Sequence, residues 1–159
     1  MVRQRFEPMG IISPGSPGLY DEEFYQALGP LADYPMFNIP WANPKSQMTQ
    51  ALEAAFTPAN PNYRFAVDCF NVGFTFEALL VAADAFKRGQ TTNGPELMTA
   101  IRATNIVDHV MIGPAIRFDD KGQNVEIPSA GVQNRNRTPT VVLPAAVATM
   151  PPVLPMPGW

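Results

Sequence analysis

Proline limits which parts of this chain can form regular secondary structure. The 159 residues include 18 prolines, whereas average usage would give about eight. Proline lacks the backbone N–H that a helix interior or a central strand requires. The prolines gathered near the C-terminus therefore predict that residues 146–159 form an extended tail on the surface. A proline-rich ligand for a recognition domain is the alternative interpretation of this tail.

The first forty residues have the pattern of an α/β sheet. Residues 6–14 and 34–41 are expected to be strands, and a Gly/Pro loop and a helix separate them. Asp21 is placed to cap that helix, and Glu22 and Glu23 lie in its first turn, where the helix dipole favours negative charge. The order strand, loop, helix, strand predicts a crossover between parallel strands.

The middle of the chain is helical. Apolar residues recur at helical spacing from Met48 to Phe56, which predicts a helix that ends in the segment 58–62 (Pro-Ala-Asn-Pro-Asn). Residues 70–88 form the longest predicted helix. They are apolar nearly all round, so we expect most of this helix to be buried, with Gly89 as its C-terminal cap.

The last third changes to short strands. One more helix opens at 93–96, with Leu97, Met98 and Ile101 facing inward. Short apolar runs follow at 107–113 and 115–118, then a turn at 119–124 and expected strands at 125–133 and 138–143.

Charge and hydropathy exclude some classes of partner. The formal net charge is -3, and no Lys/Arg cluster could neutralise a run of phosphates, so we expect no nucleic-acid partner. The N-terminus lacks the apolar segment of a signal peptide. No uninterrupted apolar run approaches the roughly 20 residues of a membrane span.

Catalytic and metal motifs are also missing from the sequence. It contains no nucleophile elbow, phosphate-binding loop or dinucleotide fingerprint. His109 has no second His or Cys at a ligand spacing, and Cys69 has no evident base, so both are interpreted as structural residues. We therefore predict that the chain is not an enzyme and needs neither a metal nor a cofactor.

Binding is the remaining functional class. Ligands of open α/β sheets lie beyond the carboxyl ends of the strands. One group of candidates comes from the first two strand ends, and the other from the start of the long helix, whose amides would favour a carboxylate. The candidate ligand-binding residues are Ser13, Gly15, Ser16, Tyr20, Trp41, Phe70, Asn71 and Phe74. For the aromatic residues, ordinary core packing is the alternative.

Three segments in order resemble a known family. In chain order they are the strand, loop and helix over 6–28, which resemble the family's second-lobe ligand loop, then the long helix 73–89, and then a C-terminal stretch. That stretch consists of 113–124 (Gly-Pro-Ala-Ile-Arg-Phe-Asp-Asp-Lys-Gly-Gln-Asn), 132–135 (Val-Gln-Asn-Arg) and 139–144 (Pro-Thr-Val-Val-Leu-Pro). Phe76-Glu77-Ala78 stands where the family has Tyr-Asp-Ala. The segments resemble the C-terminal portion of type I periplasmic binding proteins, in the branch of branched-chain amino acid receptors that feed ABC importers.

The resemblance implies an α/β fold, as an incomplete type I periplasmic-binding-protein fold with parallel sheets. Residues 1–41 and 113–145 would belong to one lobe and 42–112 to the other. The implied function is non-covalent capture of a small carboxylate, either branched-chain amino acid-like or an aromatic acid, in a cleft between lobes. An ABC permease is the implied membrane partner, and the periplasm the implied location.

Two departures from the family matter. Family members are roughly twice as long and begin with a secretion signal and a first lobe. Gly15 and Ser16 also stand where the leucine-type receptors often have a carboxylate for the ligand's amino group, which argues against an α-amino acid. Because half of the fold would leave open sheet edges, we predict self-association of this chain.

Two other functions stay open. The same half-fold could serve as a non-transport interaction or regulatory module without a complete ligand site. An α/β enzyme is a third interpretation, which the lack of a nucleophile–base pair disfavours.

Overall fold

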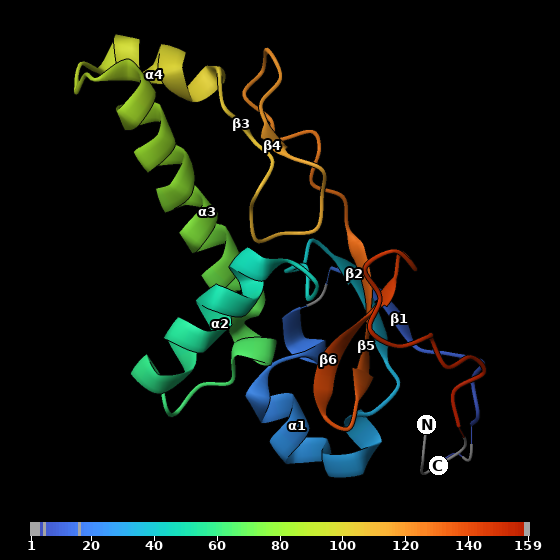
Figure 1. Cartoon of the computed structure of the whole chain (residues 1–159). Helices are drawn as coiled ribbons and strands as arrows, with labels where there is room; N and C mark the ends of the chain where they lie inside the picture. Colours follow the sequence, from blue (N-terminus) through green and yellow to red (C-terminus); the bar gives the residue numbers. More distant parts are fainter. Residues whose placement is uncertain (1–3, 5, 16, 158–159) are drawn as a thin grey trace.

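The chain is a mixed α/β protein with one four-stranded sheet and four α-helices (Figure 1). The computed structural model describes residues 4, 6–15 and 17–157. The sheet consists of β1 (Ile12–Pro14), β2 (Met36–Ile39), β5 (Ala130–Arg135) and β6 (Thr138–Leu143), in the order β1-β2-β5-β6. The helices are α1 (Glu22–Leu28), α2 (Gln47–Ala59), α3 (Phe65–Gly89) and α4 (Gly94–Arg102), with 3-10 turns η2 (Pro17–Leu19) and η3 (Gly29–Ala32). A small second sheet pairs β3 (Asn105–Ile106) with β4 (Ile116–Arg117).

The sheet is mixed, so the expectation of parallel sheets was wrong. β1 and β2 are parallel, as the predicted crossover requires, but β2 pairs antiparallel with β5 and β5 with β6. The tight turn between β5 and β6 makes that pair antiparallel. Asn136 and Arg137 both have positive φ, 51° and 57°, the backbone of a two-residue hairpin, which reverses the chain.

Prolines shorten the predicted strands. β1 keeps only the last three residues of 6–14, and Pro35 and Pro40 flank β2. β5 starts at Ala130 instead of residue 125, after Pro128. Residues 107–113 form no regular strand, although Asn43 and Ile112 donate backbone hydrogen bonds that pair part of this segment with residues 41–43.

α3 differs from its prediction at both ends and in its burial. It begins at Phe65, five residues early, and its C-cap is Gln90, in the left-handed conformation, instead of Gly89. Only six of its residues are buried, and Leu79 is 66% exposed. By length and composition α3 could span a membrane, with a mean hydropathy of 1.5 over 18 residues. Core helices of soluble proteins give the same signal, so this property carries no conclusion.

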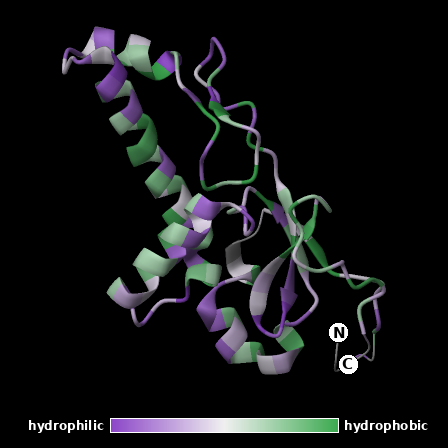
Figure 2. Ribbon diagram, viewed as in Figure 1, coloured by the Kyte–Doolittle hydropathy of each residue, from purple (hydrophilic) through white to green (hydrophobic). Residues whose placement is uncertain are grey.

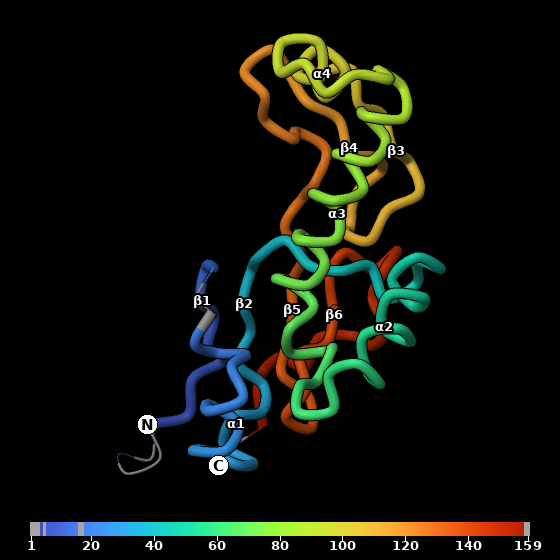
Figure 3. The backbone as a smooth tube through the Cα atoms, turned by 90° about the vertical axis from the view of Figure 1, so that its left-hand side faces the viewer, coloured from blue at the N-terminus to red at the C-terminus, as the bar shows by residue number. Residues whose placement is uncertain are grey.

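α3 links two parts of the molecule. Its first half packs with α2 beside the main sheet, and its second half extends away from the sheet toward α4 and the β3–β4 pair (Figures 1 and 3). Figure 2 shows apolar residues distributed along the whole length of α3. Exposed Met98 of α4 (50% exposed) does not face inward as predicted.

A buried carboxylate joins α3 to the segment 109–113, which connects β3 to β4. Glu77 Oε1 accepts hydrogen bonds from the backbone N–H groups of Val110 and Met111, at 3.0 and 2.7 Å, and lies 2.8 Å from His109 Nδ1. His109 Nε2 lies 3.2 Å from the Gly113 carbonyl, so both ring nitrogens face oxygen acceptors. The prediction that His109 is structural agrees with its burial in this network.

One face of the main sheet packs against the helices. The buried cluster on that face is made of Tyr20, Phe37, Ile39, Trp41, Ala42, Phe65, Cys69, Val110, Met111, Ile112, Ala130, Val132 and Val141. At the β1 end, Asn134 ties α1 and η3 to β5. Its amide donates to the carbonyls of Leu19 and Ala32 and accepts from the Tyr25 hydroxyl, at 2.7, 3.1 and 2.8 Å.

The proline-rich tail covers part of the opposite face. Gln133 is fully buried, and its amide both donates to the Val153 carbonyl and accepts from the Val153 N–H, at 3.0 and 2.9 Å. Met156 is buried and its N–H donates to the Met9 carbonyl. The tail has no helix or strand over residues 144–157, so side chains of the sheet hold it in place.

Removing residues 151–159 is expected to lower the free energy of unfolding by about 2–4 kcal/mol. The truncation leaves the Gln133 amide without its two tail partners and removes the buried side chain of Met156. Urea unfolding followed by circular dichroism measures the change. Gln133→Ala in the full chain should lower the free energy of unfolding by less than the truncation does. An unchanged urea midpoint in the truncated chain would show that the tail does not hold the sheet.

Candidate functional site

Four of the predicted ligand-binding aromatics lie together. Tyr20 is 5.0 Å from Trp41 between ring centroids, and Trp41 is 6.5 Å from Phe70. Phe70 is in turn 5.1 Å from Phe74. Phe37 of β2 completes the group, 4.9 Å from Tyr20 and 5.5 Å from Trp41. The sequence therefore identified residues that meet in space although they come from three separate segments.

These aromatic rings form part of the core and do not line an open cleft. Tyr20 and Trp41 are 4% and 3% exposed, and Phe70 and Phe74 are partly buried. Burial raises the pKa of the Tyr20 phenol, and the neighbouring Asp21 carboxylate adds to the rise. Core packing, the alternative given for the aromatics, describes Tyr20 and Trp41 in this structure.

The loop residues lie at the edge of the sheet. Ser13 belongs to edge strand β1, opposite Phe37 of β2. Gly15 has a φ of 68°, a left-handed conformation that glycine adopts without strain. Ser16 lies outside the described residues.

The helix-terminus argument for a carboxylate site was wrong. Because α3 begins at Phe65, Phe70, Asn71 and Phe74 lie in its second and third turns. Their backbone N–H groups are used inside the helix, since only the first four N–H groups of a helix are free. These three residues therefore cannot offer amides to a ligand.

A groove between α1 and the start of α3 brings two of the predicted residues, Tyr20 and Asn71, to one concave surface. Its volume is about 570 Å³, within the range of small-molecule sites. Asn71 is exposed there. The remaining walls are Asp21, Glu22, Glu23, Gln26, Pro61, Asn62, Tyr63, Arg64, Val67 and Asp68.

The groove is acidic. Four carboxylates line it against one guanidinium, that of Arg64. Arg64 already donates to Glu22 at 2.8 Å and to the Arg137 carbonyl at 3.1 Å, so it is not free to bind a ligand carboxylate. Burial raises the pKa of Asp68, and the carboxylates of Glu22 and Asp21 raise it further against the opposing effect of Arg64. A positively charged group in this groove would relieve that repulsion.

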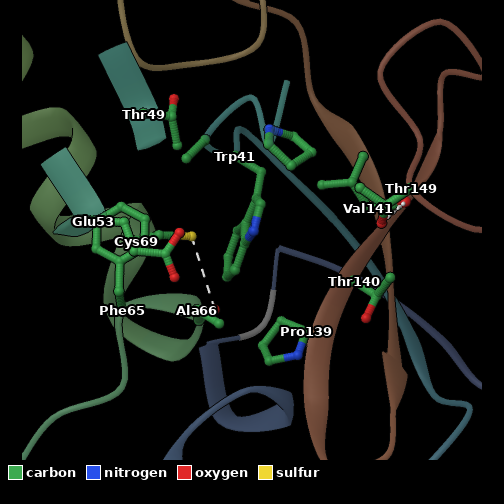
Figure 4. Close-up of a pocket in the computed structure, with 12 residues that line it drawn as sticks. Trp41, Thr49, Glu53, Phe65, Ala66, Cys69, Pro139, Thr140, Val141 and Thr149 are labelled. Atoms are coloured by element: carbon green, nitrogen blue, oxygen red, sulfur yellow. Dashed lines mark hydrogen bonds between the residues drawn. The ribbon is translucent and has the colours of Figure 1, made fainter. Parts of the chain in front are cut away.

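A second, smaller pocket lies beside Trp41. Its volume is about 160 Å³, below the usual range of ligand sites. In Figure 4 the Trp41 indole stands between Cys69 and Glu53 on one side and Val141 and Thr140 of β6 on the other. Burial raises the pKa of the Cys69 thiol to about 12, which keeps it protonated and unreactive at neutral pH. This agrees with the prediction that Cys69 is a buried structural residue.

Within residues 4, 6–15 and 17–157, no three His, Cys, Asp or Glu side chains gather in a way that could hold a metal ion. The histidine with a carboxylate partner, His109, is enclosed with Glu77.

Sequence reasoning missed two sets of residues. It assigned Asp21, Glu22 and Glu23 to helix capping alone, but Asp21 makes no side-chain cap and all three line the groove with Asp68. It also gave no role to Glu77 beyond the resemblance. The sequence did contain one signal, a single acidic residue in the middle of an apolar helix. A buried carboxylate at such a position requires hydrogen-bond donors from elsewhere in the chain.

The comparisons with known proteins give no family for this chain. No family model matches it, and no curated protein matches it.

Proposed function

We propose that this chain is the ligand-capturing, C-terminal part of an extracytoplasmic solute receptor that feeds an ABC importer. One observation supports the proposal more than any other. Tyr20 and Asn71, which the resemblance assigns to different lobes, border the same groove of about 570 Å³. The periplasmic-binding-protein fold, the periplasmic location and the permease partner rest on the resemblance and are part of this proposal.

Of the two proposed ligand classes, the groove favours an amino acid-like solute over an aromatic acid. An aromatic acid has only a negative charge to present to a groove lined by four carboxylates. An amino acid can direct its ammonium group to Asp68 and Asp21, and its apolar side chain to the exposed ring of Tyr63. These aspartates stand in for the carboxylate that is missing at Gly15–Ser16. The ligand's own carboxylate is assigned to the first lobe that the resemblance implies.

Replacing Asp68 with asparagine is expected to weaken binding of L-leucine by about tenfold or more. The substitution removes one charge-assisted hydrogen bond to the ammonium group, worth about 1.5–3 kcal/mol. Isothermal titration calorimetry measures the affinity, and Asp120→Asn, in the exposed turn after β4, is the matched control. Equal affinities for the Asp68 variant and the wild-type chain would remove Asp68 from the site.

The same binding is expected to depend on pH. The ammonium group binds the ionised form of Asp68, and the pKa of Asp68 is raised. Affinity should therefore be full above that raised pKa and fall as the pH is lowered through it, at a higher pH than for an ordinary aspartate. The Asp68→Asn variant should lack this part of the pH dependence.

An interaction module is the second candidate. The burial of Tyr20 and Trp41 in the core favours it, because these rings are not free to stack on a solute. Under this alternative the chain would bind no amino acid and would act only through its surfaces.

A further inference from the structure

An apolar stripe runs along α3, packed against the buried cluster at Val72 and Phe76 and exposed from Leu79 onward. Its members, which we call the α3 stripe, are Val72, Phe76, Leu79, Ala83 and Phe86. They follow one another at spacings of four, three, four and three residues, the pattern of a coiled-coil seam. Leu79 is 66% exposed and Phe86 50% exposed, and Val72 and Phe76 are partly buried.

The stripe contains a hole of the kind that receives a side chain of the facing helix in a coiled coil. An apolar groove of about 360 Å³ lies over Val72, Thr75, Phe76 and Leu79, with Leu52 of α2 as its side wall. Four residues at positions i, i+3, i+4 and i+7 are those that form the hole for one side chain of a facing helix. Phe86, two turns further along, is the exposed side chain large enough to fill it.

We propose that the α3 stripe is a self-association surface, on which α3 of a second copy of this chain packs antiparallel. In this arrangement Phe86 of each copy enters the hole over Val72–Leu79 of the other, about a two-fold axis near residues 80–81. The interface is then isologous, as in most homodimers. The small side chains of Thr75, Ala78 and Ala82 beside the stripe allow close approach.

The arrangement of the fold favours the antiparallel direction. The sheet, α1 and α2 lie at the first half of α3, and α4 with β3–β4 at its second half (Figure 1). Parallel packing would bring the two bulky sheet ends side by side. Antiparallel packing sets each sheet end beside the slimmer end of the other copy and opposes the helix dipoles.

The size of the stripe sets the strength of the dimer. Residues 72–86 span about 22 Å of helix, and a face of that length buries on the order of 800 Å² over two copies. Stable specific interfaces bury about 1,200–2,000 Å², and weak, transient ones less. The expected dimer is therefore weak and depends on concentration. Of the residues that line the hole, Asn71 also lines the α1–α3 groove. The four carboxylates of that groove take no part in the stripe, so the dimer is tested separately from solute binding.

Sedimentation equilibrium of the full chain from about 5 to 500 µM tests the proposal. The weight-average mass of the wild-type chain should rise from 17.4 kDa toward twice that value, and Leu79→Asp should hold it at the monomer mass. Val107→Asp, at a residue 69% exposed away from the stripe, should behave as wild type. Circular dichroism establishes that each variant is folded. A wild-type chain that stays monomeric, or a Leu79→Asp chain that associates equally well, overturns the proposal.

Cysteine cross-linking tests the direction of packing. Ala82→Cys lies near the proposed two-fold axis and should form a disulfide-linked dimer under mild oxidation. Thr75→Cys should not, because the two copies of residue 75 are about 15 Å apart along the helix axis in the antiparallel arrangement. Cross-linking of both variants would show parallel packing and contradict the proposed arrangement.

Discussion

Replacing Glu77 with alanine is expected to lower the free energy of unfolding by about 3–5 kcal/mol. The substitution leaves three buried donors without their acceptor: His109 Nδ1 and the N–H groups of Val110 and Met111. Breaking a buried, hydrogen-bonded charge network by removing one partner costs about this much, because each orphaned group keeps its desolvation penalty. Urea unfolding followed by circular dichroism gives the value.

Two further variants test whether the hydrogen bonds of Glu77 cause this loss of stability. Glu77→Gln keeps an oxygen acceptor for the backbone N–H groups and should lose less stability than Glu77→Ala. Glu7→Ala, at an exposed position, should change stability by less than about 0.5 kcal/mol. A loss below about 1 kcal/mol for Glu77→Ala would show that the Glu77 carboxylate does not stabilise the segment 109–113 between β3 and β4.

Replacing Asn134 with alanine is expected to lower the free energy of unfolding by about 3 kcal/mol. Asn134 is fully buried, and its side chain satisfies the Tyr25 hydroxyl of α1 and the carbonyls of Leu19 in η2 and Ala32 in η3. Alanine leaves these three groups unpaired and opens a small cavity.

A graded pair of variants checks the cause of this loss. Tyr25→Phe removes one of the three hydrogen bonds, so its loss should be about a third of that of Asn134→Ala. Asn62→Ala, at an exposed position, serves as the control. If Tyr25→Phe and Asn134→Ala cost the same, the two carbonyl contacts of Asn134 contribute nothing, contrary to the structure.

Local signals predicted the fold where neighbours in sequence decide the outcome. β6 has the predicted bounds because Thr and Val side chains favour strands and Pro144 ends the segment. Ser46 caps α2 with a hydrogen bond from the Thr49 N–H, a pattern readable from sequence. The α3 start was missed because its N-cap, Arg64, makes no side-chain cap, so residues 65–69 carry no start signal.

Features that depend on distant segments could not be predicted in the same way. The direction of β5 relative to β2 depends on the route of the chain between them, which the alternation of polar and apolar residues does not specify. Glu77 finds its donors 32 to 34 residues away. For the site, the aromatics were identified correctly as neighbours, but only packing shows that Tyr20 and Trp41 are buried and that the acidic walls of α1 and α3 enclose the open groove.

The central claim is that this chain captures an amino acid-like solute by its ammonium group, and thermal shift with three matched ligands tests it most directly. L-Leucine carries both charged groups, 4-methylpentanoate lacks the ammonium group, and 3-methylbutylamine lacks the carboxylate. We predict saturable stabilisation by leucine and at least as much by the amine, because the acidic groove of this chain offers the leucine carboxylate no partner. A ligand at 100 times its dissociation constant adds about 2.7 kcal/mol. The carboxylate alone should give no shift. Stabilisation by 4-methylpentanoate without any by the amine, or no shift with all three, would contradict the account.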